Sequence, residues 1–213
     1  MLSEKDHISY LSQALQLARK SPALATNFRV GAIIVSNPTP ENSSPTVLAT
    51  GYTLELAGNT HAEQCALAKL ASKFEVPEDE LSTVLDSNLN AVLYTTLEPC
   101  AKRLSGNIPC VDRILATRGS SLDSSKGIRK VIFGAKEPNT FVQNSQSCRK
   151  MTDAGLSWEY IPSMEEEILL VAKEGHNQSP NETNVDDISS AERKRQEGLP
   201  RNPKKRMMEA PPG

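Results

Sequence analysis

The sequence predicts a layered α/β domain followed by a polar tail. Three observations favour this fold class: strand-like and helix-like segments alternate over residues 1–174, two early strand patterns are joined by a polar, proline-rich loop, and no aromatic residue follows Tyr160. Alternation of this kind is typical of a sheet covered by helices. Residues 175–213 are polar and hold few branched apolar side chains, so we expect a disordered tail after a single domain.

The first expected element is a helix that begins after Ser3 and continues to Lys20. Ser3 and Asp6 have the spacing of a helix N-cap pair. The apolar side chains of this segment share one helical face: Ile8, Leu11, Leu15 and Ala18. This periodicity predicts an amphipathic helix whose apolar face packs on the sheet.

A hairpin and a second helix are expected next. Residues 28–35 and 46–52 have strand patterns, and the loop 36–45 joins them. Thr60 and Glu63 have the spacing of a capping box and are followed by strong helix formers, which predicts a helix that begins at Thr60.

The remaining pattern alternates strands with short helices. Strands are expected over residues 91–96, 130–135 and 157–161, and helices near 109–117 and over 144–154. We therefore expect five strands in all.

Composition narrows the classes of function. The formal net charge is −2 and aromatic residues make up 4% of the chain, and both values argue against nucleic acid as a partner. The chain has no apolar run of the roughly 18 to 20 residues that a membrane span needs, and its first ten residues lack the pattern of a signal peptide. These observations predict a soluble cytoplasmic protein. Four cysteines are too few to stabilise a chain of this length through disulfides, so metal binding, catalysis or burial must explain them.

Three short segments suggest a catalytic metal site. His61 and Glu63 lie at an expected helix start, Cys100 follows an expected strand, and Cys110 begins the next helix. One imidazole and two thiolates suit Zn²⁺ and leave its fourth tetrahedral position open to water. Zinc lowers the pKa of such a water toward neutrality and so supplies hydroxide, while a nearby carboxylate moves the proton. We therefore expect zinc on His61, Cys100 and Cys110, with Glu63 as the proton shuttle.

Simpler interpretations stay open for each segment. Thr60 and Glu63 would form a capping box in a protein without chemistry, and Cys100 could be an ordinary buried cysteine. Cys65 lies one helical turn after His61 and could compete as a ligand, although a place in the core is favoured for it and for Cys148. His7 and His176 are assigned no role.

At these residues the sequence resembles the zinc-dependent cytidine deaminase superfamily. The segments that carry the resemblance are THAEQC, LEPC and the IPC that ends at Cys110, and the likeness covers about residues 3–162. It implies a cytidine deaminase-like three-layer sandwich, in which a mixed five-stranded sheet lies between helices. It also implies the zinc ligands and the role of Glu63 given above.

One departure from the common pattern points to a particular branch. Nine residues separate the two cysteines in PCAKRLSGNIPC, where the common signature has two. This spacing resembles the pyrimidine deaminases of riboflavin biosynthesis, as do GNTHAEQCAL, FRVGAIIV and EPNTFV. The resemblance implies hydrolytic deamination of 2,5-diamino-6-ribitylamino-4(3H)-pyrimidinone 5′-phosphate by zinc-bound hydroxide. It further implies the stand-alone fungal type, without a fused reductase domain.

The resemblance also suggests residues that bind the substrate. Asn27 would contact the ring or its side chain, and Glu137 and Asn139 would bind hydroxyls of the ribityl chain. Lys102 and Arg103, in the loop between Cys100 and Cys110, are the nearest cationic residues in sequence that could bind the phosphate. Exposed Lys-Arg pairs are, however, commonly just solvated. The small pyrimidine phosphate is thus the expected partner, and a homodimer is implied by the resemblance alone.

Two rival functions are compatible with the same residues. The first is a deaminase of another base or nucleotide, such as deoxycytidylate, guanine or tRNA adenosine. The second is a non-catalytic, zinc-stabilised interaction module, against which Glu63 argues because a structural zinc site has no use for a carboxylate there. Basic clusters at residues 193–195 and 204–206 are either nuclear-localisation or docking signals or merely solubilising, so a nuclear location is a second option.

Overall fold

A mixed five-stranded sheet forms the centre of the protein, as expected from the resemblance. The computed structural model describes residues 2–37, 44–103, 105–119, 125–138 and 146–176. The strands are β1 (Gly31–Ser36), β2 (Thr46–Tyr52), β3 (Ala91–Leu97), β4 (Lys130–Ala135) and β5 (Ser157–Tyr160). Their order in the sheet is β2-β1-β3-β4-β5, with β1 antiparallel to β2 and β3, and with the pairs β3–β4 and β4–β5 parallel.

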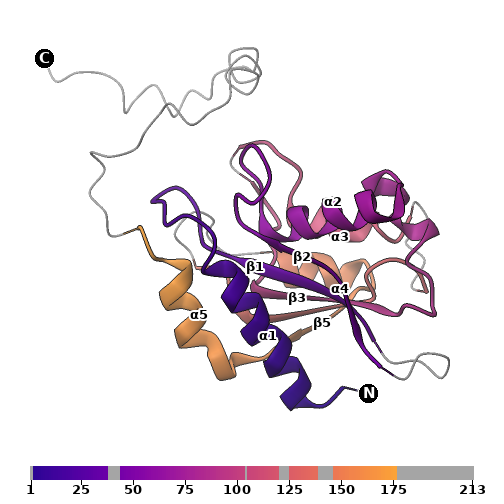
Figure 1. Cartoon of the computed structure of the whole chain (residues 1–213), viewed down its shortest axis with the longest axis horizontal. Helices are drawn as coiled ribbons and strands as arrows, with labels where there is room; N and C mark the ends of the chain where they lie inside the picture. Colours follow the sequence, from indigo (N-terminus) through magenta and orange to yellow (C-terminus); the bar gives the residue numbers. More distant parts are fainter. Residues whose placement is uncertain (1, 38–43, 104, 120–124, 139–145, 177–213) are drawn as a thin grey trace, which may run out of the picture. The chain divides into compact units, whose positions relative to one another are not determined.

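Helices cover both faces of this sheet and complete a three-layer sandwich (Figure 1). One face carries α1 (Glu4–Ala18) and α5 (Glu165–Ala172), and the other carries α2 (Ala62–Phe74), α3 (Cys110–Ala116) and α4 (Ser147–Asp153). Short 3₁₀ turns occupy Glu78–Thr83 and Pro162–Met164.

The core divides between the two sides of the sheet because successive strand side chains point to opposite faces. Ala32 and Ile34 of β1 pack with α2 and α3, whereas Ile33 and Val35 pack with α1. Every residue of β1 and β3 is buried, as is typical of central strands covered on both faces.

Strand direction determines where the loops meet. Because β1 is antiparallel to both of its neighbours, β2 runs in the same direction as β3 and β4. The carboxyl ends of these three strands therefore lie at one edge of the sheet, together with the amino end of β1. The helices α2 and α3 follow β2 and β3 in the chain and begin at this edge. Ligands of open α/β sheets bind at such an edge.

Gly51 lets β2 approach the first turn of α2 very closely. A Cβ at this position would lie 2.2 Å from the carbonyl oxygen of Ala62 and 2.6 Å from the amide nitrogen of Ala66. Only glycine leaves room for such a contact with another backbone. The contact positions the start of α2, where His61 and Glu63 lie.

Most expected elements are confirmed. Helix α1 has the capping box of Ser3 and Asp6, in which each side chain bonds to the other residue's amide. The 3₁₀ turns and α5 had no counterpart in the sequence prediction. The last expected helix is shorter than residues 144–154, since α4 covers Ser147–Asp153, and positions 144–145 lie outside the described residues.

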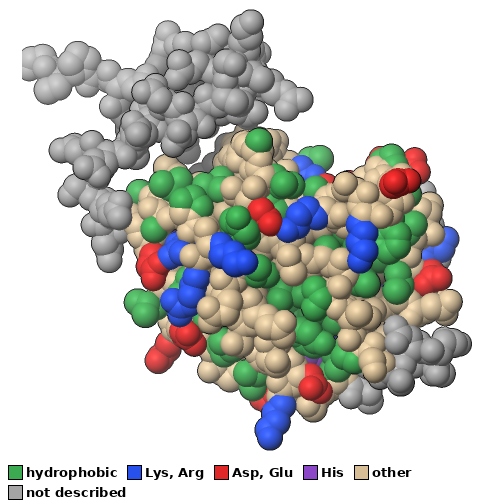
Figure 2. All heavy atoms as spheres, viewed as in Figure 1, with side chains coloured by type: hydrophobic (Ala, Val, Ile, Leu, Met, Phe, Trp, Pro, Cys, Tyr) green, Lys and Arg blue, Asp and Glu red, His purple; other side chains and the backbone are tan. Residues whose placement is uncertain are grey.

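Over the described residues, no helix is both long and apolar enough to cross a bilayer. On the face drawn in Figure 2, basic side chains are interspersed with acidic and apolar ones. The expected tail, residues 175–213, lies outside the described chain except for Gly175 and His176.

Candidate metal centre and substrate cavity

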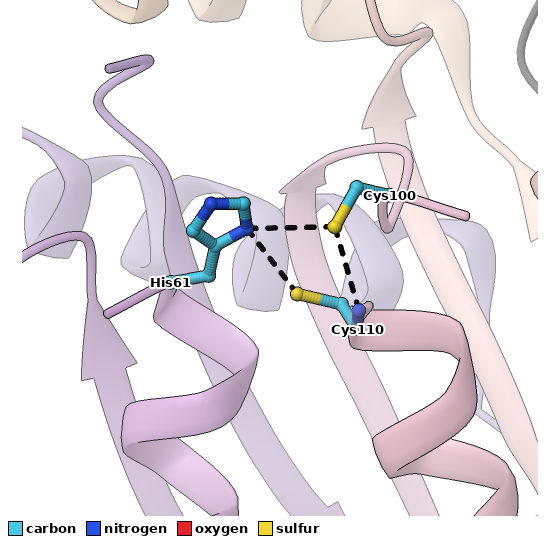
Figure 3. Close-up of side chains that lie close together, drawn as sticks. All are labelled: His61, Cys100 and Cys110. Carbon is cyan, nitrogen blue, oxygen red and sulfur yellow. Dashed lines mark hydrogen bonds between the residues drawn. The ribbon is translucent and has the colours of Figure 1, made fainter. Parts of the chain in front are cut away.

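His61, Cys100 and Cys110 converge at the edge of the sheet where β2 and β3 end (Figure 3). His61 is the N-cap residue of α2, Cys100 follows β3, and Cys110 is the first residue of α3. The Nδ1 atom of His61 lies 3.5 Å from the sulfur of Cys100 and 3.4 Å from that of Cys110. The ligand atoms of all three residues lie within 4.8 Å of one another.

These distances fit a tetrahedral zinc site. With Zn–S and Zn–N bonds of ordinary length, two ligands at the tetrahedral angle would place nitrogen and sulfur about 3.5 Å apart. Both observed nitrogen–sulfur distances agree with this value. The donor set, one imidazole nitrogen and two sulfurs, is also the set that zinc prefers.

The two cysteines do not share the same surroundings. The amide of Cys110, at the start of α3, donates to the sulfur of Cys100 at 3.4 Å. Hydrogen bonds from the Cys110 side chain and from His61 lower the pKa of the Cys100 thiol, against the opposing effect of burial. A lowered pKa favours the thiolate, which is the form that binds metals.

Glu63 lies directly beside this cluster and is buried within it. Its Oε1 accepts a hydrogen bond from the Thr95 hydroxyl at 3.2 Å, and its Oε2 lies 3.4 Å from the sulfur of Cys110, which donates to it. Burial raises the pKa of the Glu63 carboxyl above its usual range, and the charge of Cys100 adds to the effect. A carboxyl with a raised pKa is suited to accept and release a proton near neutral pH.

The capping box expected for Thr60 and Glu63 is wrong. His61, not Thr60, is the N-cap residue of α2, and its side chain makes no capping hydrogen bond. The Thr60 hydroxyl instead donates to the carbonyl of Leu56 at 3.0 Å. The side chain of Glu63 points to Thr95 of β3, so this position serves the site rather than the helix end.

A cavity of about 150 Å³ opens beside the cluster. Its walls include His61, Glu63 and Cys100 and four of the five residues that sequence analysis named for substrate contacts: Asn27, Lys102, Arg103 and Glu137. The fifth, Asn139, lies outside the described residues. The cavity also has polar lining residues that sequence reasoning missed: Thr26, Thr53, Asn59, Glu98 and Ser105.

Lys102 and Arg103 differ in exposure despite being adjacent. Lys102 is exposed at the cavity. Arg103 is buried, and its guanidinium donates to the Asn59 carbonyl at 2.6 Å and to Oε1 of Gln64 at 3.0 Å. Arg103 thus fastens the loop between the two cysteines to the start of α2, and both side chains line the cavity.

Glu98 connects three segments around the cavity. One carboxylate oxygen accepts from the Ser147 hydroxyl at 2.5 Å and from the Cys148 thiol at 3.4 Å, and the other accepts from the Glu137 amide at 3.3 Å. The loop after β3 is thereby joined to the loop after β4 and to the start of α4. Burial raises the pKa of Glu137 to about 8, and nearby negative charge, including that of Glu98, contributes.

The other cysteines and histidines lie away from the cluster. Cys65 is fully buried on α2, as expected, and it does not join the metal-ligand group. Cys148 packs against the core between α2 and the sheet, and its thiol donates a hydrogen bond to Glu98. The Nδ1 atom of His7 lies 2.7 Å from the Tyr94 hydroxyl. His176 contacts the segment that carries Asn27, a contact that its place in the sequence gave no reason to expect.

Comparison with known proteins agrees with this geometry. Residues 4–122 match the cytidine and deoxycytidylate deaminase zinc-binding region, a range that holds His61, Cys100 and Cys110 and every lining residue of the cavity named above except Glu137. The chain therefore belongs to this family of zinc-binding deaminases.

Among the similar proteins are pyrimidine deaminases from two fungi. The diaminohydroxyphosphoribosylamino-pyrimidine deaminase of Schizosaccharomyces pombe is 33% identical over 171 residues, which are 80% of this chain and 36% of that protein. The chain thus spans about a third of the length of this curated relative. A crystal structure of Aspergillus oryzae Rib2 deaminase, a C-terminal deletion mutant, is 49% identical with a TM-score of 0.72 and covers 81% of this chain and 93% of that one. A second structure of that deaminase, in complex with DARIPP, is 48% identical with a TM-score of 0.70 and covers 80% and 92%.

Replacement of Glu98 tests its connecting role. Glu98→Ala removes the acceptor of the buried Ser147 hydroxyl and of the Glu137 amide, so we expect the free energy of unfolding to fall by about 3 kcal/mol. Glu98→Gln keeps one acceptor oxygen, so its free energy of unfolding should lie between those of Glu98→Ala and the wild type. Urea denaturation of the purified variants measures the change, and a wild-type unfolding curve for Glu98→Ala would contradict this role.

Proposed function

We propose that this chain is a hydrolytic deaminase of 2,5-diamino-6-ribitylamino-4(3H)-pyrimidinone 5′-phosphate, an intermediate of riboflavin biosynthesis. The observation that carries the proposal is the buried carboxyl of Glu63 beside a three-ligand metal cluster at the wall of a cavity. The choice of substrate is supported by the Rib2 deaminase structure in complex with DARIPP, which is 48% identical to this chain.

His61, Cys100 and Cys110 would hold the zinc ion, and their three ligand atoms leave a fourth position for water or substrate. When bound, zinc lowers the pKa of water and so supplies a nucleophile at neutral pH. The protein's own contribution is to hold the ligand atoms at the required spacing before the metal arrives. Gly51 contributes to this spacing, because it packs β2 against the turn that carries His61.

Glu63 would move the proton in this reaction. Its carboxylate takes a proton from the attacking water and passes it to the amino group, which leaves as ammonia while a C–O bond replaces the C–N bond. The hydroxyl of Thr95 holds Oε1 by a hydrogen bond, so Oε2 is the oxygen that faces the cluster. Burial raises the pKa of Glu63 and brings it nearer the value that such a transfer needs.

The remaining cavity residues would bind the substrate. Asn27 and Glu137 offer hydrogen bonds for the ring and for the ribityl hydroxyls, and Lys102 and Arg103 offer cations for the phosphate. Asn139 keeps its proposed contact with the ribityl chain. A homodimer, a cytoplasmic or nuclear location, a boundary between residues 174 and 175 and a role for the basic clusters stay predictions from the sequence.

Zinc content separates the ligand cysteines from the core cysteine. We expect Cys100→Ala to lose most of its zinc, because two ligands hold the ion far more weakly than three. Cys65→Ala is the matched control, since Cys65 lies one helical turn after His61 but is buried in the core, and it should retain zinc. Elemental analysis of the purified variants provides the measurement, and loss of zinc from Cys65→Ala with retention in Cys100→Ala would reverse the assignment.

Glu63→Gln tests the proton transfer. The amide keeps the size of the side chain but cannot accept the proton, so we expect kcat to fall about 10³-fold while zinc content is unchanged. Ammonia release measures the rate, and the exposed Glu80→Gln serves as control.

The wild-type enzyme should be assayed in parallel on the ribitylaminopyrimidine phosphate, deoxycytidylate, guanine and tRNA. If deoxycytidylate, guanine or tRNA is deaminated and the ribitylaminopyrimidine phosphate is not, the proposed substrate is wrong and the chain belongs with another branch of the family. Unchanged kcat in Glu63→Gln would support a non-catalytic zinc module instead.

Lys102→Ala tests recognition of the phosphate. Loss of one charge-assisted contact should raise KM for the phosphorylated substrate about tenfold and leave KM for the dephosphorylated compound unchanged. Lys126→Ala removes an exposed lysine outside the cavity and is the control. An equal rise for both compounds would argue against a phosphate contact.

A further inference from the structure

One wall of the cavity lies in a segment without regular structure. Residues 26–28, which we call the cavity wall, lie between α1 and β1, and all three line the cavity. No helix or strand ladder holds them in place. Their position must therefore come from other contacts with the rest of the chain.

The last residue of α5 and the residues that follow it supply these contacts. We call residues 172–176 the C-terminal strap, and Figure 1 shows the end of α5 beside the loop between α1 and β1. The amide of Arg29 donates to the carbonyl of Ala172 at 3.1 Å. The Arg29 guanidinium donates to the carbonyls of Ser21, at 2.8 Å, and of Arg19, and it pairs with Glu174. Arg29 thus joins the strap to both ends of the loop.

Gly175 brings the strap against the middle of the same loop. Its φ is +93°, and a Cβ at this position would lie 2.5 Å from the carbonyl carbon of Ala23. Both the backbone conformation and the close approach require glycine. The close approach also directs the next residue, His176, toward the cavity wall.

His176 holds the cavity wall by two contacts. Its ring stacks on Phe28, with centroids 4.9 Å apart and an interplanar angle of 25°. Its Nε2 lies 3.1 Å from the carbonyl oxygen of Asn27. A carbonyl can only accept, so Nε2 must carry the hydrogen in this contact. His176 is not among the residues that line the cavity, whereas Phe28 and Asn27 are, so these two residues can pass its effect on to a ligand.

We propose that His176 is a positioning residue for substrate binding. By stacking on Phe28 and bonding to the backbone of Asn27, it fixes the cavity wall and so sets the affinity for the substrate. Glu63 and the metal ligand His61 belong to α2 and its N-cap, a different element from the cavity wall, so His176 affects KM rather than kcat. This inference rests on the proposed function for the identity of the substrate, but not for the contact itself.

Kinetics of His176 variants of the full chain test the proposal. His176→Ala removes both contacts, and we expect KM to rise about five- to tenfold, as for the loss of one hydrogen bond, with kcat within about twofold of wild type. His176→Phe keeps the stacking and His176→Gln keeps a donor, so each should raise KM less than alanine does. Glu167→Ala removes the exposed Arg19–Glu167 pair between α1 and α5 and is the control. Unchanged KM in His176→Ala, or a fall in kcat alone, overturns the proposal.

Hydrogen exchange without substrate provides a second, independent measurement. Amides of residues 23–29 should exchange faster in His176→Ala than in wild type, whereas those of α2 and β3 should not change and zinc content should stay at the wild-type level. If the wild-type protein does not deaminate the ribitylaminopyrimidine phosphate, the proposed function fails, and exchange still tests the contact. If the wild type is active and neither KM nor exchange changes in the variants, only the role of His176 fails. Faster exchange throughout the chain would indicate a merely structural role and would also overturn it.

Discussion

The direction of β1 is the constraint on which the site depends. Because β1 is antiparallel to both neighbours, the carboxyl ends of β2, β3 and β4 meet at one edge of the sheet. The helices that follow β2 and β3 then begin at that edge and bring His61 and Cys110 together, while the end of β3 supplies Cys100. If β1 instead ran parallel to β3, β2 and β3 would point in opposite directions, and the start of α2 would lie at the far edge.

The same edge concentrates negative charge in a buried place. Glu63 and Glu98 are both less than 10% exposed, and the thiolate of Cys100 lies beside Glu63. Buried charges without compensation are costly, and the raised pKa values of Glu63 and Glu137 show this cost. A divalent cation held by two thiolates and an imidazole would offset much of it, so metal binding and the stability of this edge are physically coupled.

The sequence predicted the parts of the fold that depend on local pattern. The strands at residues 46–52 and 130–135 and the capping box of Ser3 and Asp6 were correct, because strand periodicity and side-chain capping act over a few neighbouring residues. The capping box of Thr60 and Glu63 was wrong, since Thr95, more than thirty residues away, takes the Glu63 side chain. The grouping of His61, Cys100 and Cys110 followed from ligand chemistry. The roles of Arg103, Glu98 and His176 depend on contacts between distant segments and leave no pattern in the sequence.

The cavity is therefore assembled from two kinds of structure with different mechanical properties. The metal cluster and Glu63 lie on or next to regular elements whose backbone is held by hydrogen-bond ladders, which is where a reaction needs its groups most accurately placed. The cavity wall has no such ladder and is held by the side chains of Arg29 and His176 and by the close packing of Gly175. Such a wall is less costly to displace than a strand. Changes in the C-terminal strap can thus alter which ligand fits the cavity, and how tightly, while the geometry of the reacting groups stays the same.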